Sequence, residues 1–297
     1  MKTKVFALGL LIPLTACLKQ NYPLGNNNAQ SNTIKGAIVM RDWHGKALES
    51  PQAHVLAQFV KPAADKGAVR LGLRLPELAH KKGPNRESTQ CEVIREPKPI
   101  NSVQAKDATV SVGKVLFGTN SDNLFALTEG DNHLYQLPLQ SNFAPGIYVA
   151  SVEGTQVTPS FAMKLSMPEI MSHVLVAGQD FETSATAFRK NESLRLSWDA
   201  PTGEFDLKVN QMELEITSET EKETVSLVCA AIEKDLMSGS TVVNWEIPSN
   251  YLQALDATTS GLVVLKRGQW MRASNPDIGV VSFEGVRIYA TPALIAE

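Results

Sequence analysis

The 297-residue sequence predicts a mainly β protein with two β-sandwich domains in tandem, the second of them immunoglobulin-like. From residue 34 onward, apolar and polar residues alternate with period two, as in strands that bury one face. Clusters of Gly, Asn, Asp and Pro separate these segments and supply the residues that turns require. The first half contains no long pattern of an amphipathic helix. Together these observations favour sheets packed on sheets.

The N-terminus predicts a secretory signal peptide over residues 1–16. Two lysines precede an apolar run from Val5 to Leu14, which is too short to span a bilayer. The run ends in "LTAC", which resembles the lipobox of bacterial lipoproteins. This resemblance implies cleavage before Cys17 and attachment of acyl chains, palmitate among them, to its sulfur and amine. Several chains together anchor a protein stably, whereas one chain binds only marginally.

Residues 17–33 are predicted to form a flexible, lipid-anchored tether. They are rich in Asn, Gln and Ser and show no hydrophobic period. A flexible coil of about 16 residues holds the folded part roughly 20–25 Å from the lipid. The residue after Cys17 is Leu18 rather than an aspartate, which favours the outer membrane of a Gram-negative cell envelope as the location.

Residues 34–170 are predicted to be a β-rich domain. The segment "AVRLGLRLP" places four apolar residues on one strand face and two arginines on the other, and "FAMKLSM" shows the same alternation at 161–167. The pattern loosens over 167–171, so the domain boundary is placed there.

Residues 171–297 are predicted to be a β-sandwich. At least six strand patterns follow one another in this part, with turn residues every 8–20 positions. Trp198 and Trp245 are in phase with the apolar residues of their strands and are expected in the core. Pro248 and Ser249 introduce a short helical turn.

Two resemblances support this arrangement. The segment "SLRLSWDAPTG" resembles a strand of fibronectin type III and immunoglobulin-like domains. The order of "PGIYVASVEGTQVTPSFAMKLSMP", "SLRLSWDAPTG", "VSLVCA", "WEIPSNYLQAL" and "GLVVLKR" is similar to two-domain lipoproteins of Gram-negative bacteria. The resemblance implies a fold and a location, and it brings no catalytic residues with it.

The two remaining cysteines allow two interpretations. If Cys17 carries lipid, Cys91 and Cys229 are left in an oxidising compartment, where they can form a disulfide that joins the two halves of the chain. Alternatively, Cys229 is a buried free thiol, because it shares a strand face with Val225 and Leu227.

The composition argues against a nucleic-acid-binding protein, since the pI is about 6.0 and the formal charge is −3. The sequence contains no phosphate-binding glycine loop and no closely spaced metal ligands, so no cofactor and no metal are expected. No motif identifies catalytic residues. Whether the protein is an enzyme stays open, with a non-catalytic role favoured.

Three clusters require separate interpretation. The segments around Asn120 and Glu129 contain oxygen ligands that calcium uses, but their spacing is typical of turns. Asp42 and His44 are interpreted as part of a solvated strand edge with one packed tryptophan, rather than as an acid–base pair.

The third cluster surrounds Trp270, which is expected in a loop between Arg267 and Arg272. An exposed aromatic side chain between cations is typical of a contact site for a protein or an anionic glycan.

The sequence therefore favours a membrane-anchored envelope lipoprotein that acts in structure or recognition. Its expected partners are the membrane, through the N-terminal lipid, and an envelope protein or glycan, with no nucleic acid. The alternatives are a carbohydrate-active enzyme or other hydrolase with a site assembled from loops, and a periplasmic carrier or assembly factor.

Overall fold

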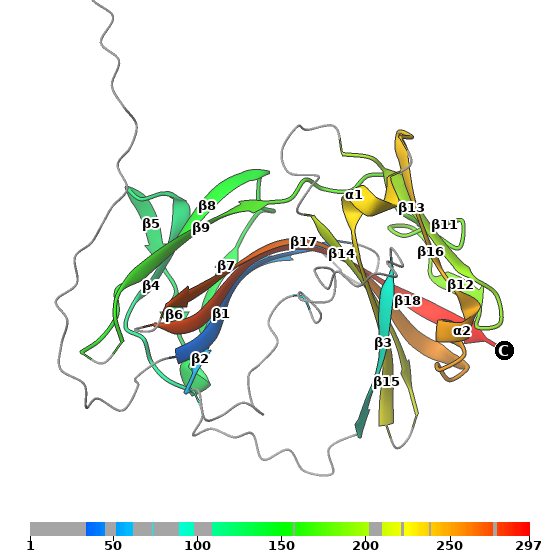
Figure 1. The fold of residues 1–297 in the computed structure, drawn as a ribbon, viewed down its shortest axis with the longest axis horizontal. Coiled ribbons are helices and arrows are strands. Elements are labelled where there is room, and N and C mark those ends of the chain that lie inside the picture. The colour runs from blue at the N-terminus through cyan, green and yellow to red at the C-terminus, as the bar shows by residue number, and fades with distance from the viewer. Residues whose placement is uncertain are drawn as a thin grey trace, which may run out of the picture. The chain divides into compact units, whose positions relative to one another are not determined.

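The computed structural model describes residues 34–44, 52–61, 73, 89–97, 109–156, 158–201, 210–220, 223–237, 239–275 and 278–297. The chain is mainly β, as predicted, and its sheets pack in a sandwich-like arrangement (Figure 1). The predicted signal peptide, tether and lipidated Cys17 lie outside the described residues, as does most of the "AVRLGLRLP" segment.

One large sheet of ten strands forms the centre of the fold. Its strands lie in the order β3 (Gln90–Pro97), β15 (Glu223–Ile232), β14 (Gln211–Glu219), β17 (Thr258–Asn275), β18 (Gly279–Ala296), β1 (Ile34–His44), β2 (Gln52–Val60), β7 (Tyr135–Leu139) and β6 (Thr128–Glu129), and β12 (Thr186–Arg189) also pairs with β18.

Strand β18 joins segments that lie far apart in the sequence. β1 pairs with it in parallel from Gly279 to Tyr289, and β12 pairs with it in parallel from Ala293 to Ala296. Strands from both predicted domains are thus hydrogen-bonded in one sheet, and residues 32–297 form one compact unit. The tandem two-domain layout with a boundary at residue 170 is therefore not confirmed, and the immunoglobulin-like character of the second part stays a prediction.

Two four-stranded sheets accompany the large one. The first has the order β5 (Asn123–Ala126), β4 (Val115–Asn120), β8 (Gly146–Val152) and β9 (Phe161–Met167). The second has the order β11 (Gln179–Asp180), β10 (Leu175–Val176), β13 (Leu194–Asp199) and β16 (Val242–Ile247). The predicted strand over 161–167 is confirmed by β9.

Two hydrophobic cores lie between the small sheets and the large sheet. The N-terminal core includes Ile38, Val55, Phe59, Phe117, Tyr148, Met163 and Phe283. The C-terminal core includes Trp198, Leu214, Leu227, Trp245, Val263, Tyr289 and Ile295, so the two tryptophans expected in the core are confirmed there. Phe283, Tyr289 and Ile295 are separated by even numbers of residues on β18, so both cores lie on the same face of the large sheet.

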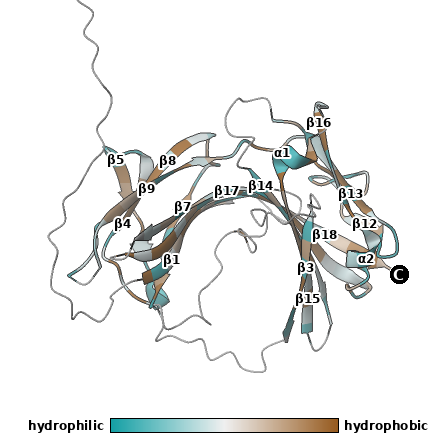
Figure 2. Ribbon diagram, viewed as in Figure 1, coloured by the Kyte–Doolittle hydropathy of each residue, from teal (hydrophilic) through white to brown (hydrophobic). Residues whose placement is uncertain are grey.

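The helices are short. Among the described residues they are the 3-10 turn η3 (Asp131–His133), α1 (Glu233–Leu236) and α2 (Ser249–Leu252), the last of which confirms the predicted helical turn. Figure 2 shows α1 in the colour of hydrophilic residues, whereas parts of β8 are hydrophobic. None of the helices in the described ranges is long and apolar enough to cross a membrane.

Candidate functional site

The prediction that Trp270 lies in a loop is wrong, and the contact role expected for it stays a prediction. Residues 258–275 form the single strand β17, and Trp270 pairs there with Glu284 of β18. Arg267 is three residues from Trp270 and therefore points to the other face of the sheet. Arg267 is only 1% exposed, while Arg272 is exposed. The prediction failed because it took a charged side chain as a sign of solvent exposure.

The charge of Arg267 is neutralised inside the protein by Glu233, the first residue of α1. Arg267 Nε donates to Glu233 Oε2 at 2.9 Å, and Nη2 donates to Oε1 at 2.8 Å. Glu233 also accepts hydrogen bonds from Trp198 Nε1 at 2.8 Å and from Asn210 Nδ2 at 2.9 Å. Charge-assisted, forked hydrogen bonds of this kind satisfy a buried carboxylate on both oxygens.

A second buried ion pair joins Arg287 of β18 to Asp42 of β1. The two residues are register partners, both are completely buried, and Arg287 Nη1 donates to Asp42 Oδ2. Arg287 Nε donates to the carbonyl of Pro168 at 2.9 Å, and Nη2 donates to the carbonyl of Phe143 at 2.8 Å. Burial lowers the pKa of Arg287, and the carboxylate of Asp42 opposes that shift.

The interpretation of Asp42 and His44 as a solvated edge is wrong. β1 lies between β18 and β2, so it is no edge strand. Asp42 and His44 are two residues apart and share a strand face. His44 Nε2 lies 3.5 Å from Asp42 Oδ2, and its ring stacks on Tyr289 with 5.0 Å between centroids. Trp43 packs on the opposite face, so only the packed tryptophan was predicted correctly.

Tyr289 binds the main chain of the segment that connects the two small sheets. We call residues 168–174, between β9 and β10, the crossing segment. The hydroxyl of Tyr289 accepts a hydrogen bond from the Met171 N–H at 2.7 Å. Burial raises the pKa of Tyr289 to about 12, so the phenol stays neutral at physiological pH. Arg267 Nη1 adds a hydrogen bond to the carbonyl of Glu169 at 3.2 Å.

These residues form one charged layer between the two cores. The charged layer comprises Asp42, His44, Glu233, Arg267 and Arg287, and the neutral phenol of Tyr289, from the C-terminal core, borders it. Arg267 and Arg287 are register partners on β17 and β18, and Arg287 lies between Phe283 of the N-terminal core and Tyr289 of the C-terminal core. A Cβ on the neighbouring Gly285 would lie 3.1 Å from the carbonyl of Ser166, so the glycine lets the main chain of β9 approach.

The sequence contained a signal for part of this layer. Arg287 is in phase with Phe283 and Tyr289, both of which are buried, so its position in the alternation predicts an inward side chain. An inward arginine requires a buried carboxylate or carbonyl partner. Neither Asp42 nor Glu233 could be assigned as that partner from the sequence, because each is far from its arginine along the chain.

The face of the large sheet that lies opposite the cores carries further buried charges. Lys266 Nζ donates to Glu213 Oε1 at 2.8 Å and lies 3.2 Å from Glu215 Oε2. Glu284 accepts the backbone N–H of Leu73 at 2.9 Å, and burial raises the pKa of its carboxyl.

The oxygen-rich side chains of Asn120 and Glu129 are engaged in local contacts. Asn120 Oδ1 accepts the backbone N–H groups of Asp122 at 3.0 Å and Asn123 at 2.9 Å. Glu129 pairs with His133 at 2.6 Å. In the part of the chain that the structure describes, no group of three or more His, Cys, Asp and Glu side chains is arranged to hold a metal ion.

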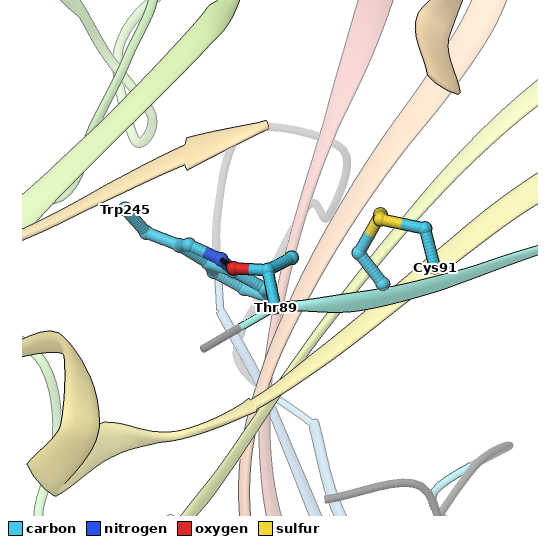
Figure 3. Close-up of a disulfide and its surroundings, with 4 residues drawn as sticks. Thr89, Cys91 and Trp245 are labelled. Atoms are coloured by element: carbon cyan, nitrogen blue, oxygen red, sulfur yellow. Dashed lines mark hydrogen bonds between the residues drawn. A yellow bond between two sulfur atoms is a disulfide. The ribbon is translucent and has the colours of Figure 1, made fainter. Parts of the chain in front are cut away.

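Cys91 and Cys229 form a disulfide, one of the two arrangements that the sequence left open (Figure 3). They are register partners on the adjacent strands β3 and β15, with their Cα atoms 4.0 Å apart. The bond joins residues 138 positions apart in the sequence. Beside it, Trp245 Nε1 donates to Thr89 Oγ1 at 2.8 Å.

No family model matches the chain, and the search of curated proteins gives no match.

Proposed function

We propose that the protein is a lipid-anchored lipoprotein of the cell envelope, held at the outer membrane of a Gram-negative bacterium, with a structural or recognition role toward an envelope protein or glycan. The "LTAC" sequence and the polar stretch after it support the anchor. The two hydrophobic cores support a rigid body for the anchored part, because side chains fill the space between the sheets.

The observation that supports a non-catalytic role is that carboxylates of the charged layer bind buried arginines. Asp42, His44 and Glu233 are residue types that hydrolases use for proton transfer. Here Glu233 is surrounded by protein donors, and Asp42 is completely buried against Arg287. Both arginines also bind carbonyl groups of the crossing segment. This engagement of Glu233 and Asp42 by the two arginines supports a structural use of both carboxylates.

Crosslinking in living cells tests the proposed role. The full-length chain is crosslinked in the envelope, and the attached molecules are identified by mass spectrometry. We expect a reproducible envelope protein or glycan partner. Recovery of no partner, together with cleavage of an envelope polymer by the purified protein, would overturn the proposal in favour of a hydrolase.

The anchor has a separate test with a matched variant. Cys17→Ser should abolish labelling by a fatty-acid analogue and release the protein from the membrane fraction, because the thiol is the acyl acceptor. Unchanged labelling and membrane association in this variant would contradict the lipoprotein assignment.

A further inference from the structure

Strand β3 contributes little to either core. It is the first strand in the order of the large sheet, and among the described strands it pairs with β15. No side chain from Gln90 to Glu96 is buried, whereas β15 buries the seven consecutive side chains from Val225 to Ala231. Cys91 is partly buried and packs against the C-terminal core, but it is not one of the buried members of that core, which lie between Met171 and Ile295. The buried members of the C-terminal core therefore all come from strands and segments other than β3.

Outside the disulfide, the side-chain contacts of residues 89–97 are noncovalent. Ile94 packs against Val228 and Ala230 of β15, and Arg95 Nη2 donates to the carbonyl of Ala254 at 3.5 Å. Thr89 accepts the hydrogen bond from Trp245. Arg95 pairs with Glu223 at 2.6 Å, but these side chains are 53% and 35% exposed. Exposed pairs of this kind contribute little to stability, because water and salt screen them. The covalent bond is thus the strongest side-chain link between β3 and the rest of the sheet.

We propose that the Cys91–Cys229 disulfide is a redox-sensitive clasp for β3. Reduction releases β3 from β15, while both cores and the charged layer stay folded. The outer edge of β15 then becomes the edge of the large sheet, and its backbone N–H and C=O groups are free to pair with another strand.

The reductant is a dithiol, and Cys91 is the side from which it reacts. Cys91 is partly exposed, whereas Cys229 is completely buried. A thiolate of the dithiol attacks Cys91 Sγ, the S–S bond breaks, and Cys229 leaves as a thiolate that takes up a proton. The second thiol of the reagent then displaces Cys91, so the protein gains two electrons and two protons and the reagent becomes a disulfide.

Hydrogen exchange read by mass spectrometry tests the clasp on the full chain, with and without dithiothreitol. We expect exchange over residues 89–97 to accelerate about tenfold or more on reduction, because local opening is no longer restrained by a covalent bond. Exchange over β17 and β18 should stay within about twofold, because the cores hold these strands.

Two variants control the experiment. In Cys91→Ala/Cys229→Ala, residues 89–97 should exchange as fast as in the reduced protein and should not respond to dithiothreitol. In Arg95→Ala, which removes the exposed ion pair and keeps the disulfide, β3 should stay protected until reductant is added.

Two results would overturn the proposal. If β3 stays protected after complete reduction, shown by alkylation of both thiols, the backbone ladder alone holds it. If protection is lost in β17 and β18 as well, the bond supports the whole fold and is no clasp.

Discussion

The centre of the large sheet and its β3 edge are held by different means. At the centre, Arg267 and Arg287 are buried, and their partners are buried carboxylates and main-chain carbonyls. At the edge, β3 has exposed side chains, an exposed ion pair and one disulfide. The comparison teaches that burial decides how much an arginine–carboxylate pair contributes to the stability of the fold. The buried pairs at the centre support the fold, whereas the exposed pair at the edge adds little.

The difference follows from desolvation. A buried ion whose partner is removed has no water to replace that partner, so the loss is large. An exposed ion regains its hydration shell when its partner is removed. The centre is thus sensitive to single substitutions, while the edge depends on its covalent bond.

The largest effect is expected for Arg287→Met. Methionine fills similar volume but leaves the Asp42 carboxylate and the carbonyls of Phe143 and Pro168 without their donor. The free energy of unfolding should fall by about 3–5 kcal/mol, measured by urea denaturation.

Arg195→Met is the matched control for that prediction. Arg195 lies 3.5 Å from Glu246, and their side chains are 81% and 53% exposed. Its loss should change the free energy of unfolding by less than about 1 kcal/mol. Equal effects of the two substitutions would contradict the claim that burial decides how much an arginine–carboxylate pair contributes to stability.

The next effect concerns the covalent bond. Cys91→Ala/Cys229→Ala should lower the free energy of global unfolding by about 2–4 kcal/mol, because the unfolded chain loses a crosslink between distant residues. The far-UV circular dichroism spectrum should stay that of a β protein. Complete loss of structure at room temperature would show that the fold depends on the β3 edge as much as on the centre of the sheet.

A smaller effect is expected for Glu284→Gln on the face opposite the cores. Burial raises the pKa of Glu284 above 4.5 in the folded state, so the folded protein holds this proton more tightly than the unfolded chain. Stability should therefore fall as pH rises from about 4.5 through the folded pKa.

The glutamine variant checks this sign, because the amide oxygen that replaces the carboxylate can still accept the N–H of Leu73. Urea denaturation at several pH values should show the decline in the natural protein and a weaker decline in the variant. A parallel pH dependence in both would exclude Glu284 as its source.

The smallest effect is expected at the exposed pair of His173 and Asp199. The hydrogen bond between them, at 2.6 Å, raises the pKa of His173 and lowers the pKa of Asp199. The contribution of His173 is present below pH 6.5 and is lost as pH rises through its folded pKa, and that of Asp199 is present above pH 3.8 and is lost as pH falls.

An NMR titration measures this pair directly. In Asp199→Asn, the pKa of His173 should return toward 6.5, with little change in stability because both side chains are exposed. An unchanged His173 titration would show that the hydrogen bond does not form in solution.

The sequence predicted the fold class because strand alternation is local. Trp198 and Trp245 were assigned to the core from their phase alone, and both are buried. The pairing of β1 with β18 could not be predicted, because parallel partners 245 positions apart, such as Asp42 and Arg287, leave no local pattern.

The charged layer was missed for a related reason. Charges in a strand pattern indicate solvent unless a buried partner neutralises them, and only the folded chain brings Arg267 to Glu233. The same assumption produced the wrong loop assignment at Trp270. The position of Arg287 in the strand alternation predicted its burial better than its residue type did.

The central claim is that the charged layer and the shared large sheet make the two cores one cooperative unit. Differential scanning calorimetry of the purified chain tests it most directly. The account predicts one transition with a calorimetric enthalpy equal to the van't Hoff enthalpy. Two resolved transitions, one for each core, would contradict it and would support two independent domains with a boundary near residue 170.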